Sequence, residues 1–533
     1  MREINNFREL LYDSAEAFSE RTAFLQKNLR GEVEEVSYER LKNDAESLGK
    51  ALVKRGLRGK KIAISGKNSY HWCLCYLAIT CFVGVVVPVD KELPEEEFMN
   101  IIDFSEAELF IGDDKTLSAV RSKKGGLVSV NMNEGVDALI DEGKKLSDDL
   151  LLYDIDSEKM SVLLFTSGTT GMTKGVMLSQ KNICSDLTDV KDCIELSEND
   201  RSLSVLPLHH TYECIAFLMI IYCGGSVAFS GSIRTLKNDF QLFRPTVLVC
   251  VPLLLERFYK MIVNKMKEEG KRKKAQLITG LSGIISEESR RKIFSDVHSV
   301  FGGKLQKIVV GAAALSEEIE REFVSFGFKV IVGYGLTECS PIVICNSVSD
   351  SQISSIGKPM KSVQVEIRHK DESDIGEICV KGPMVMLGYY KNPEATEKVL
   401  SDGWFSTGDS GYVDKYGYYH ITGRKKNVIV TKNGKNIYPE ELEFYLMKHS
   451  VIKETVVTSE RGDIVTAHIL PDEEAVAQKL KKSEVTPAEI KKAVTLAVRE
   501  VNRKVPSYKN IRDIVIRTTE FSKTTTHKIK RHE

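Results

Sequence analysis

Segment 164–175, LFTSGTTGMTKG, combines hydroxyl side chains, glycines and a single lysine, Lys174. Glycines let the backbone turn tightly and bring its N–H groups close to an anion. Hydroxyls and amides donate hydrogen bonds to phosphate oxygens, and the lysine supplies a point charge. The segment therefore predicts a loop that binds phosphate groups, with an ordinary polar turn as the alternative.

This loop differs from the common phosphate loop, which reads G-x-x-x-x-G-K-[ST]. Here Thr173, not a glycine, precedes Lys174, so the tight backbone wrap of that motif is lost. A hydroxyl-rich loop suits transient contact with phosphates that must leave. Pyrophosphate as a departing group fits this description.

The strand that must carry the loop is predicted at SVLLFT (161–166). Similar apolar runs recur between helical patterns, at 61–65, 84–89, 107–112, 225–230, 246–251, 307–312 and 329–334. Continuous apolar strands separated by helices indicate parallel sheets covered on both faces. The sequence therefore predicts the α/β class for the larger part of the chain.

The pattern changes after about residue 355. Segments such as VQVEIRHK and GYVDKYGYYHITGR alternate apolar and polar residues around glycine turns, which is typical of antiparallel strands. The last hundred residues indicate strand, helix and strand again, followed by a lysine-rich tail. We expect a β-rich segment and then a small α+β domain, with the junction near Gly423 and Arg424.

Composition narrows the function classes. The chain has 533 residues, too many for one hydrophobic core, so several subdomains are expected. Lys plus Arg and Asp plus Glu both number 75, and this zero net charge argues against nucleic-acid binding. The 11 cysteines form no Cys-x-x-Cys pair, which favours buried thiols in a reducing compartment over a zinc site.

The sequence shows neither a signal peptide nor an apolar run typical of a transmembrane helix. The N-terminal residues, MREINNFREL, lack an apolar signal-peptide core. The longest apolar run, 73–89, contains Gly84 and Pro88 and predicts a short helix followed by a buried strand. The basic run 264–274 is expected to be a solvated helix end, with at most peripheral contact with an anionic membrane. We expect a cytoplasmic protein without a transmembrane segment.

Five blocks carry a family resemblance. Segment 165–182, FTSGTTGMTKGVMLSQKN, resembles the phosphate-loop signature of the adenylate-forming superfamily, which includes acyl-CoA synthetases, peptide-synthetase adenylation domains and luciferases. LPLHH (206–210) resembles its aromatic acyl-pocket motif, and VGYGLTECSP (332–341) its Tyr-Gly-x-Thr-Glu block. Segment 403–443 resembles its Thr-Gly-Asp and hinge blocks, and SKTTTHKIKR (522–531) its C-terminal lysine motif. The blocks span essentially the whole chain and are most like bacterial long-chain fatty acid–CoA ligases.

The resemblance implies both a fold and a reaction. The fold is a large N-terminal body of two doubly wound, mostly parallel sheets plus a distorted β-barrel segment, with a small mobile α+β C-terminal domain. The implied domains are 1–424, which binds the nucleotide, and 425–533, a lid with the catalytic lysine. The implied substrates are a fatty acid or other carboxylic acid, ATP with Mg²⁺, and CoA as co-substrate. The acid is activated as acyl-AMP and then transferred to a thiol.

The resemblance also implies the nucleotide site. It places the phosphate loop on the β- and γ-phosphates, Thr337 at the α-phosphate, Tyr334 against adenine and Asp409 at the ribose hydroxyls. Thr166 and Glu338 would hold Mg²⁺. The implied binding residues are Thr166, Ser167, Gly168, Thr169, Thr170, Gly171, Thr173, Lys174, Gly311, Ala312, Ala313, Gly333, Tyr334, Gly335, Thr337, Glu338, Asp409, Ile421, Arg424 and Lys528.

Four further roles are implied for single residues. Lys528 is the catalytic lysine of adenylation, since an ammonium neutralises the charge that gathers at the carboxylate and α-phosphate. Lys426 is the hinge about which the C-terminal domain rotates, and Gly434 lines the thiol channel. His210 closes the acyl pocket and counts with Thr166, Glu338 and Lys528 as catalytic.

Two alternatives stay open. The acceptor thiol could belong to the phosphopantetheine of an acyl carrier protein, which would make the chain a stand-alone loading enzyme for an acyl or amino acid. The second alternative is a non-catalytic acyl-nucleotide sensor. It is motivated by His527, which stands where the family has glycine immediately before the catalytic lysine, and by Ser522 in place of the usual proline.

Overall fold

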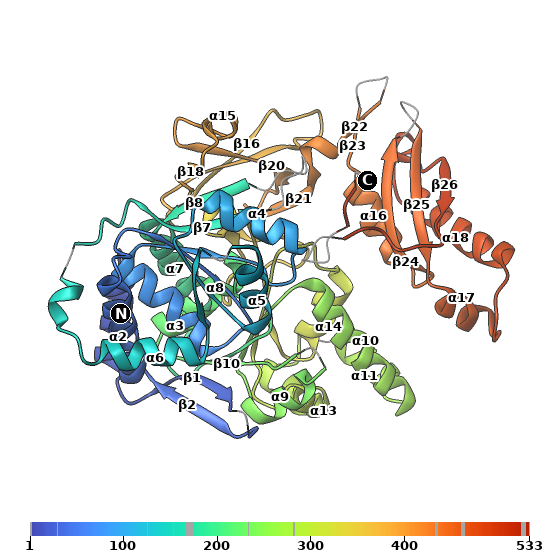
Figure 1. The fold of residues 1–533 in the computed structure, drawn as a ribbon. Helices are drawn as coiled ribbons and strands as arrows, with labels where there is room; N and C mark the ends of the chain where they lie inside the picture. Colours follow the sequence, from blue (N-terminus) through green and yellow to red (C-terminus); the bar gives the residue numbers. More distant parts are fainter. Residues whose placement is uncertain are drawn as a thin grey trace. The chain divides into compact units, whose positions relative to one another are not determined.

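The computed structural model describes residues 3–28, 30–124, 126–152, 154–166, 174–232, 234–280, 283–431, 435–459, 464–523 and 529–531 (Figure 1). The chain divides into two compact units. The first comprises Met1–Val365, Val380–Phe405 and Gly417–Tyr419, and the second comprises Glu366–Cys379, Ser406–Tyr416 and His420–Glu533. The division into domains at 424/425 stays a prediction.

A nine-stranded sheet lies in the first unit, in the order β15-β14-β13-β12-β11-β9-β10-β1-β2. The neighbours from β13 to β1 pair in parallel, and antiparallel pairs add β2 at one end and β14 and β15 at the other. The strands are β1 (Thr22–Lys27), β2 (Val33–Ser37), β9 (Arg201–Ser204), β10 (Ser226–Phe229), β11 (Val247–Cys250), β12 (Lys307–Val310), β13 (Lys329–Gly335), β14 (Ile342–Cys345) and β15 (Lys358–Pro359).

A seven-stranded sheet lies in the same unit, in the order β18-β8-β7-β4-β3-β5-β6. Its neighbours from β7 to β6 pair in parallel, whereas β8 and β18 are antiparallel additions at one edge. The strands are β3 (Lys61–Ser65), β4 (Val85–Pro88), β5 (Leu109–Gly112), β6 (Val128–Asn131), β7 (Met160–Thr166), β8 (Lys174–Ser179) and β18 (Gly388–Tyr389). The predicted pair of mostly parallel sheets is confirmed.

Every strand predicted from an apolar run is present, as β3, β4, β5, β7, β10, β11, β12 and β13. The run 73–89 is divided as expected, because it supplies the end of a helix, a π-helical turn and then β4. Strands β3, β4, β5, β11 and β12 are buried along nearly their whole length, which explains why their sequences are apolar without alternation.

The helices of the first unit begin at residues suited to helix starts. Pro252 opens α10, Asn6 caps α1, and Ser179 forms a capping box with Asn182 at α7. The helices are α1 (Phe7–Phe18), α2 (Tyr38–Lys54), α3 (Tyr70–Ala78), η1 (Ile79–Val83), α4 (Glu95–Ser105), α5 (Asp114–Lys123), α6 (Glu134–Gly143), η2 (Asp148–Leu151), α7 (Gln180–Ile194), α8 (Thr211–Tyr222), α9 (Leu236–Phe243), α10 (Pro252–Glu268), α11 (Arg272–Gly280), α12 (Glu287–Ile293), α13 (Ser295–Val300), α14 (Glu317–Ser325), η3 (Thr337–Cys339) and α15 (Pro393–Glu397).

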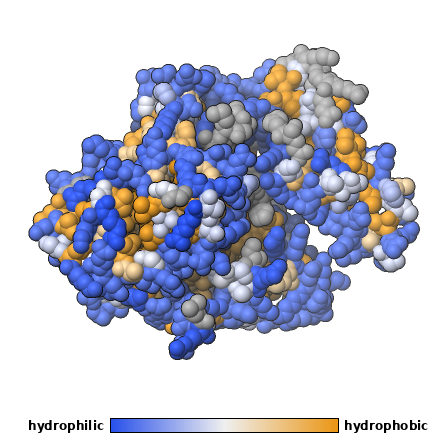
Figure 2. All heavy atoms as spheres, in the orientation of Figure 1, coloured by the Kyte–Doolittle hydropathy of each residue, from blue (hydrophilic) through white to orange (hydrophobic). Residues whose placement is uncertain are grey.

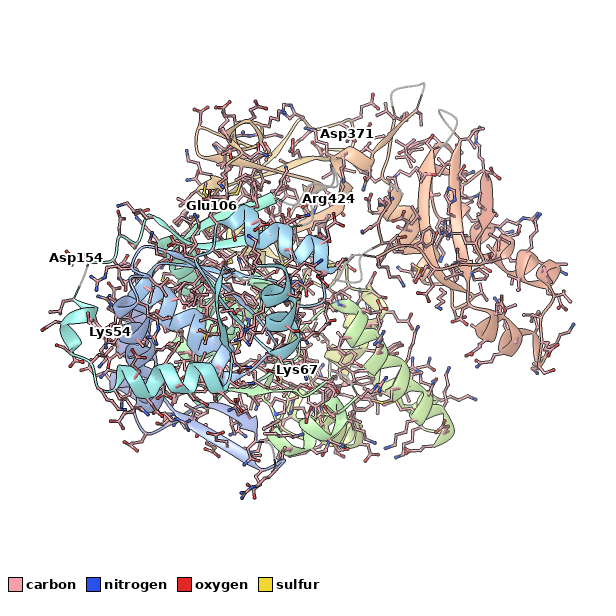
Figure 3. The ribbon with its side chains drawn as sticks, in the orientation of Figure 1. Lys54, Lys67, Glu106, Asp154, Asp371 and Arg424 are labelled. Atoms are coloured by element: carbon pink, nitrogen blue, oxygen red, sulfur yellow. The ribbon has the colours of Figure 1, made fainter. Side chains whose placement is uncertain are left out.

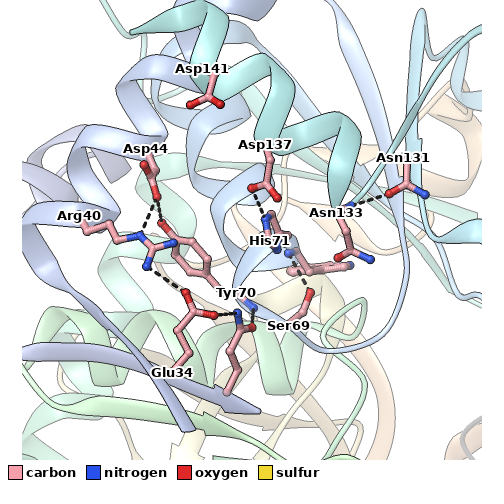
Figure 4. Close-up of polar contacts among 12 residues, drawn as sticks. Glu34, Arg40, Asp44, Ser69, Tyr70, His71, Asn131, Asn133, Asp137 and Asp141 are labelled. Carbon is pink, nitrogen blue, oxygen red and sulfur yellow. Dashed lines mark hydrogen bonds and ion pairs between the residues drawn. The ribbon is translucent and has the colours of Figure 1, made fainter. Parts of the chain in front are cut away.

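A polar network that runs from a buried tyrosine to the surface joins α2 to α3 (Figure 4). The Tyr70 hydroxyl donates to Asp44 Oδ2 at 2.8 Å, and Arg40 bridges Asp44 to Glu34 on β2. Tyr70 is fully buried, and burial together with the neighbouring Asp44 carboxylate raises the pKa of its hydroxyl well above the ordinary value. The hydroxyl therefore stays a donor and fixes the spacing of the two helices.

A third sheet has the order β16-β17-β20-β19, with β21 paired to β20. Its strands are β16 (Gln364–Arg368), β17 (Gly376–Lys381), β19 (Leu400–Ser401), β20 (Trp404–Val413) and β21 (Tyr419–Arg424). They coincide with the segments of alternating apolar and polar residues after residue 355, so the predicted β-rich segment is confirmed.

The C-terminal part of the second unit is α+β, as expected. It contains η4 (Lys425–Asn427), β22 (Ile429–Val430), β23 (Asn436–Ile437), α16 (Pro439–Met447), β24 (Ile452–Ser459), β25 (Val465–Pro471), α17 (Glu473–Leu480), α18 (Pro487–Asn502), η5 (Ser507–Lys509) and β26 (Asp513–Ile516). Strands β24, β25 and β26 form a sheet, and a separate apolar core that includes Leu442, Ile469 and Val494 lies between it and the helices (Figure 1).

The surface drawn in Figure 2 is mostly hydrophilic, and its apolar residues lie in separate areas. Among the described residues, no helix combines the length and the apolar character needed to cross a bilayer. The basic run 264–274 covers the end of α10 and the start of α11 and is largely exposed, as predicted.

Candidate functional site

The two ends of the predicted phosphate loop are held by strand pairing. Thr166 ends β7 and Lys174 begins β8, and these two residues face each other across the antiparallel pair. Ser167, Gly168, Thr169, Thr170, Gly171 and Thr173 lie outside the described residues, so their contacts with phosphate stay predictions. The structure does show that the loop connects the ends of a fixed hairpin.

Tyr389 connects the lysine of this loop to Glu338. The Tyr389 hydroxyl donates to Glu338 Oε1 at 2.9 Å, and Lys174 Nζ lies 4.5 Å from the centroid of the same ring. Tyr389 is only 6% exposed, and burial followed by the Glu338 carboxylate raises the pKa of its hydroxyl well above the ordinary value. Lys174 and Glu338, both predicted for the nucleotide site, are thus brought together by Tyr389, which was not predicted.

Backbone hydrogen bonds hold this arrangement. Tyr389 pairs with Val176 of β8, and the Tyr390 N–H donates to the Gly175 carbonyl at 2.7 Å. The Met386 N–H donates to the Glu338 carbonyl at 2.8 Å. The segment before and through β18 therefore fastens the η3 turn, which contains Glu338, to the strand that begins with Lys174.

Thr337 contacts Thr211, the residue after His210, at the start of α8. Thr337 Oγ1 lies 3.2 Å from Thr211 Oγ1, and Thr211 is the first residue of that helix. His210 is the residue before it, and its ring centroid lies 4.1 Å from that of His209. His209 Nε2 in turn lies 3.5 Å from Asp90 Oδ2. The predicted α-phosphate contact and the predicted acyl-pocket residue thus share one locality.

The predicted adenine residues follow two adjacent parallel strands. Gly311, Ala312 and Ala313 come directly after β12, and Gly333, Tyr334 and Gly335 end β13. Ala312 has a φ of +71°, which is uncommon for a residue with a side chain. A Cβ at Gly335 would lie 1.6 Å from the Pro341 carbonyl oxygen, so only glycine fits there.

An apolar cavity of about 30 Å³ lies beside α8. Tyr212, Ile215, Ala216 and Met219 line it from that helix, and strands β11 and β12 contribute valines. The Tyr212 hydroxyl donates to the Val309 carbonyl, and the ring lies against Gly311, the predicted adenine residue. The walls offer aliphatic and aromatic surface and no charged group, but a cavity of this volume holds only about one methylene and no fatty acyl chain without movement of its walls.

Glu213 does not line this cavity. Its side chain is buried, bonded to Ser204 and the Leu206 backbone, and burial raises the pKa of its carboxyl to about 8.

In the second unit, Asp409 and Arg424 form an ion pair. Arg424 Nε lies 2.8 Å from Asp409 Oδ1, and Arg424 also donates to the Thr407 carbonyl. Figure 3 labels the Arg424 side chain. Asp409 is 6% exposed, and its N–H donates to Thr407 Oγ1. Gly408 has a φ of +72°, so glycine is suited to the bend that turns the Asp409 backbone.

The remaining predicted residues of this unit lie nearby in sequence. Ile421 on β21 is 41% exposed, and Lys426 lies in the η4 turn. Burial, then Arg424 and Arg531, lower the pKa of the Lys426 ammonium. Gly434 and Lys528 lie outside the described residues, so the thiol channel and the catalytic lysine stay predictions.

The donors in the first unit fit a magnesium ion that arrives with a triphosphate. Glu338 offers a half-buried carboxylate, which Mg²⁺ favours. Within the part of the chain that the structure describes, no three His, Cys, Asp or Glu side chains gather into a metal site. One protein carboxylate supplemented by phosphate oxygens and water is the arrangement that Mg²⁺ adopts with nucleotides.

Tyr389 was missed by the sequence analysis, although the segment GEICVKGPMVMLGYY contains it. The signal available in the sequence was an aromatic residue, Tyr389, directly after Gly388 in the segment that follows strand β17. Nothing in the spacing showed that this residue pairs with β8, more than 200 positions earlier in the chain.

Family comparisons match nearly the whole chain. The family described as AMP-binding enzyme matches residues 11–390, and the family described as AMP-binding enzyme C-terminal domain matches residues 426–533.

Individual relatives are identical to this chain at between a quarter and a third of the aligned residues. Long-chain-fatty-acid–CoA ligase FadD15 of Mycobacterium bovis is 28% identical over 92% of this chain and 88% of its own length. Long-chain-fatty-acid–[acyl-carrier-protein] ligase AEE15 of Arabidopsis thaliana is 26% identical over 86% of this chain and 75% of its own.

Solved structures share the fold. o-Succinylbenzoate CoA synthetase of Bacillus subtilis, in complex with its acyl-adenylate intermediate, superposes with a TM-score of 0.78 and 21% identity, over 98% of this chain and 97% of that one. The same enzyme has been solved with ATP and a magnesium ion, and it superposes with a TM-score of 0.75 and 21% identity over 98% of both chains.

Proposed function

We propose that this chain, which belongs to the AMP-binding enzyme family, is an AMP-forming fatty acid–CoA ligase. Ligase chemistry of the acyl-CoA type is common to the family and to the relatives that match most of the chain. That the acid is a fatty acid is a more specific proposal. It rests on the names of those relatives, and the apolar character of the residues beside α8 agrees with it.

The proposed reaction has two balanced steps. A carboxylate oxygen of the acid attacks the α-phosphorus of ATP, the bond to the β-phosphate oxygen breaks, and pyrophosphate leaves. The product is a mixed anhydride, acyl-AMP. A CoA thiol then attacks the acyl carbon, loses its proton, and AMP leaves with the bonding electron pair. Activation is needed because oxide is a very poor leaving group.

In the first unit the proposed roles follow from charge and position. Lys174 and the loop from Thr166 neutralise the β- and γ-phosphates, and Thr337 donates to the α-phosphate. Thr166 and Glu338 would hold Mg²⁺, which would withdraw charge from the phosphate oxygens. Tyr334, with Gly333, Gly335 and residues 311–313, forms the adenine pocket.

In the second unit Asp409 accepts hydrogen bonds from the ribose hydroxyls, and Arg424 orients the Asp409 carboxylate. Lys528 neutralises the charge shared by the acid and the α-phosphate during adenylation. Lys426 is the proposed hinge and Gly434 the proposed wall of the thiol channel. Both belong to the second step, because pantetheine must reach an acyl-AMP that is already formed.

The observation that carries the choice of acid is the similarity to long-chain-fatty-acid–CoA ligases over most of the chain, and the apolar side chains beside α8 agree with it. All the side chains that line the cavity there are aliphatic except the Tyr212 ring, whose hydroxyl is bonded to a backbone carbonyl. A substrate with a buried ammonium or carboxylate at its far end would find no partner there, at a cost of several kcal/mol for an unpaired charge.

The test is a screen for pyrophosphate release with ATP, Mg²⁺ and a panel of carboxylic acids that includes fatty acids of several lengths, aromatic acids and amino acids. We expect release with fatty acids and little with amino acids. The proposal fails if only amino acids or aromatic acids are activated. Supplying CoA or a phosphopantetheinyl carrier protein to the preformed acyl-AMP then identifies the thiol acceptor.

The carrier-protein reading is the second candidate, and one relative, AEE15, is named for that acceptor. Thioester formed with the carrier and not with CoA would establish it. The sensor reading, motivated by His527, predicts nucleotide binding without release of pyrophosphate. It would be excluded by a single acid that gives turnover.

A further inference from the structure

We propose that Tyr389 is a positioning residue for adenylation: it orients the Glu338 carboxylate toward the metal of the incoming nucleotide and keeps that carboxylate apart from Lys174. This inference deepens the proposed function and rests on it. Tyr389 touches neither the acid nor the reacting phosphorus in this account, and it acts through the two charged groups on either side.

The hydroxyl side of Tyr389 determines the orientation of Glu338. A phenol has a single proton, and here it is directed at Glu338 Oε1 over 2.9 Å. A tyrosine hydroxyl is protonated near neutral pH in any case, so it acts as a donor to the Glu338 carboxylate. A carboxylate fixed at one oxygen loses little further freedom when the other oxygen binds a cation, as with ligands fixed by outer partners in other metal sites.

The ring side of Tyr389 holds Lys174. The ammonium lies 4.5 Å from the ring centroid, within the range of a cation–π interaction. No ion pair between Lys174 and Glu338 occurs in the described part of the chain, although both are within reach of the same tyrosine. Their direct pairing would neutralise the cation meant for phosphate and the anion meant for the metal, and ATP would have to break it.

Tyr389 itself is held rigidly. Its backbone is paired with Val176 in β8, its N–H donates to Thr396 Oγ1 at 2.9 Å, and its side chain is buried. Thr396 Oγ1 donates in turn to the Asn392 carbonyl, the backbone of the residue that caps α15. A ring fixed in this way can separate two opposite charges at a constant spacing.

Two substitutions divide the roles of the hydroxyl and the ring. Tyr389→Phe removes the donor to Glu338 and keeps the ring under Lys174, whereas Tyr389→Leu removes both. The matched control is Tyr390→Phe, because the hydroxyl of that neighbouring tyrosine bonds Lys61 and Glu106 instead.

The first measurement is equilibrium binding of ATP by calorimetry without acid, in Mg²⁺ and in EDTA. We expect Tyr389→Phe to lose about tenfold in affinity in Mg²⁺ and nothing in EDTA. Tyr389→Leu should lose affinity in both, since Lys174 is then free to collapse onto Glu338. Tyr390→Phe should match the wild-type protein.

The second measurement is kinetic. Tyr389→Phe should raise the Mg²⁺ concentration for half-maximal pyrophosphate release about tenfold with little change in kcat at saturating Mg²⁺. Transfer from supplied acyl-AMP to CoA should be unaffected. A merely structural role would lower kcat, acyl transfer and the melting temperature together.

Outcomes separate this inference from the proposed function. If the wild-type protein binds Mg²⁺ and ATP as described but releases pyrophosphate with no acid, the proposed function fails while the binding data still decide the role of Tyr389. If the wild-type protein releases pyrophosphate and Tyr389→Phe has the same Mg²⁺ dependence as Tyr390→Phe, the inference is wrong.

Discussion

Arg424 Nε lies 2.8 Å from Asp409 Oδ1, and the two residues come from neighbouring strands, β21 and β20. Asp409 is almost completely buried, whereas the Arg424 side chain is about half exposed. The arginine therefore holds a buried carboxylate in one orientation from the solvent side. This state suits the role proposed for Asp409, which is to accept hydrogen bonds from the ribose.

Replacing Asp409 with asparagine should weaken the use of ATP. The amide keeps the shape but loses the charge and turns one acceptor into a donor, so we expect kcat/KM for ATP to fall about 10- to 100-fold. Pyrophosphate release at varied ATP measures the effect. Asp374→Asn is the control, since that carboxylate is 86% exposed in a surface ion pair. Equal losses in both variants would contradict the role of Asp409.

Replacing Lys528 with alanine should separate the two steps. Adenylation should fall by about 10²–10³ or more, because charge stabilisation at the reacting phosphate is lost, while thioester formation from supplied acyl-AMP should persist. Lys523→Ala is the control, because Lys523 lies in the same tail but pairs with Glu454 and Glu520. Adenylation that survives in Lys528→Ala would show that the catalytic lysine lies elsewhere.

Glu213 should make stability depend on pH. Burial raises the pKa of its carboxyl to about 8, above the value near 4.3 expected in the unfolded chain. Between these values the folded protein keeps a proton that the unfolded chain has lost. This contribution to stability is therefore complete at low pH and is lost as pH rises toward 8, at up to about 1.4 kcal/mol per pH unit.

The test of this pH dependence compares apparent melting temperatures at pH 5 and pH 8. Glu213→Gln should gain stability relative to the wild-type protein at pH 8, and the difference should be smaller at pH 5. Glu20→Gln, on an exposed residue, controls for the loss of a charge. A Glu213→Gln variant with the same difference between pH 5 and pH 8 as the wild-type protein would refute the assignment.

Filling the cavity beside α8 should shorten the preferred acid. Ala216→Phe adds more volume than the cavity holds, so the ring must displace Tyr212, Ile215 or Met219. If the acyl chain binds beside α8, we expect activity on long acids to fall about tenfold or more relative to short ones. Ala216→Leu is a milder variant in case the ring overpacks the core. Ala17→Phe, on the exposed side of α1, is the control. An unchanged ratio of long to short acids in both Ala216 variants would place the acyl chain elsewhere.

The apolar strands of the two sheets could be predicted because their burial on both faces leaves a continuous signal. Strands β1, β2 and β9 carried no such signal, since polar residues such as Gln26, Glu34 and Arg201 interrupt them. Their place is determined by pairing with distant strands, and that information is absent from a local pattern.

In the candidate site, too, some residues could be predicted from the sequence, whereas the contacts between them could not. Thr166, Lys174 and Glu338 were named from motifs, because loops and turns at strand ends keep recognisable residue types. The contact that joins Lys174 to Glu338 could not be predicted from motifs. It depends on the packing of Tyr389, which is far from both residues in the sequence. Likewise, the buried setting of Glu213 required the structure, since the letters HHTYE do not show which way α8 turns.

Strand β18 closes the edge of the seven-stranded sheet at β8. A ribosome makes residues 388–389 long after it has released β8, at roughly 5–20 residues per second. For at least ten seconds of synthesis, therefore, the growing polypeptide has an uncovered β8 edge that invites pairing with other chains. Truncations ending before residue 388 should therefore leave this edge uncovered and be prone to aggregate.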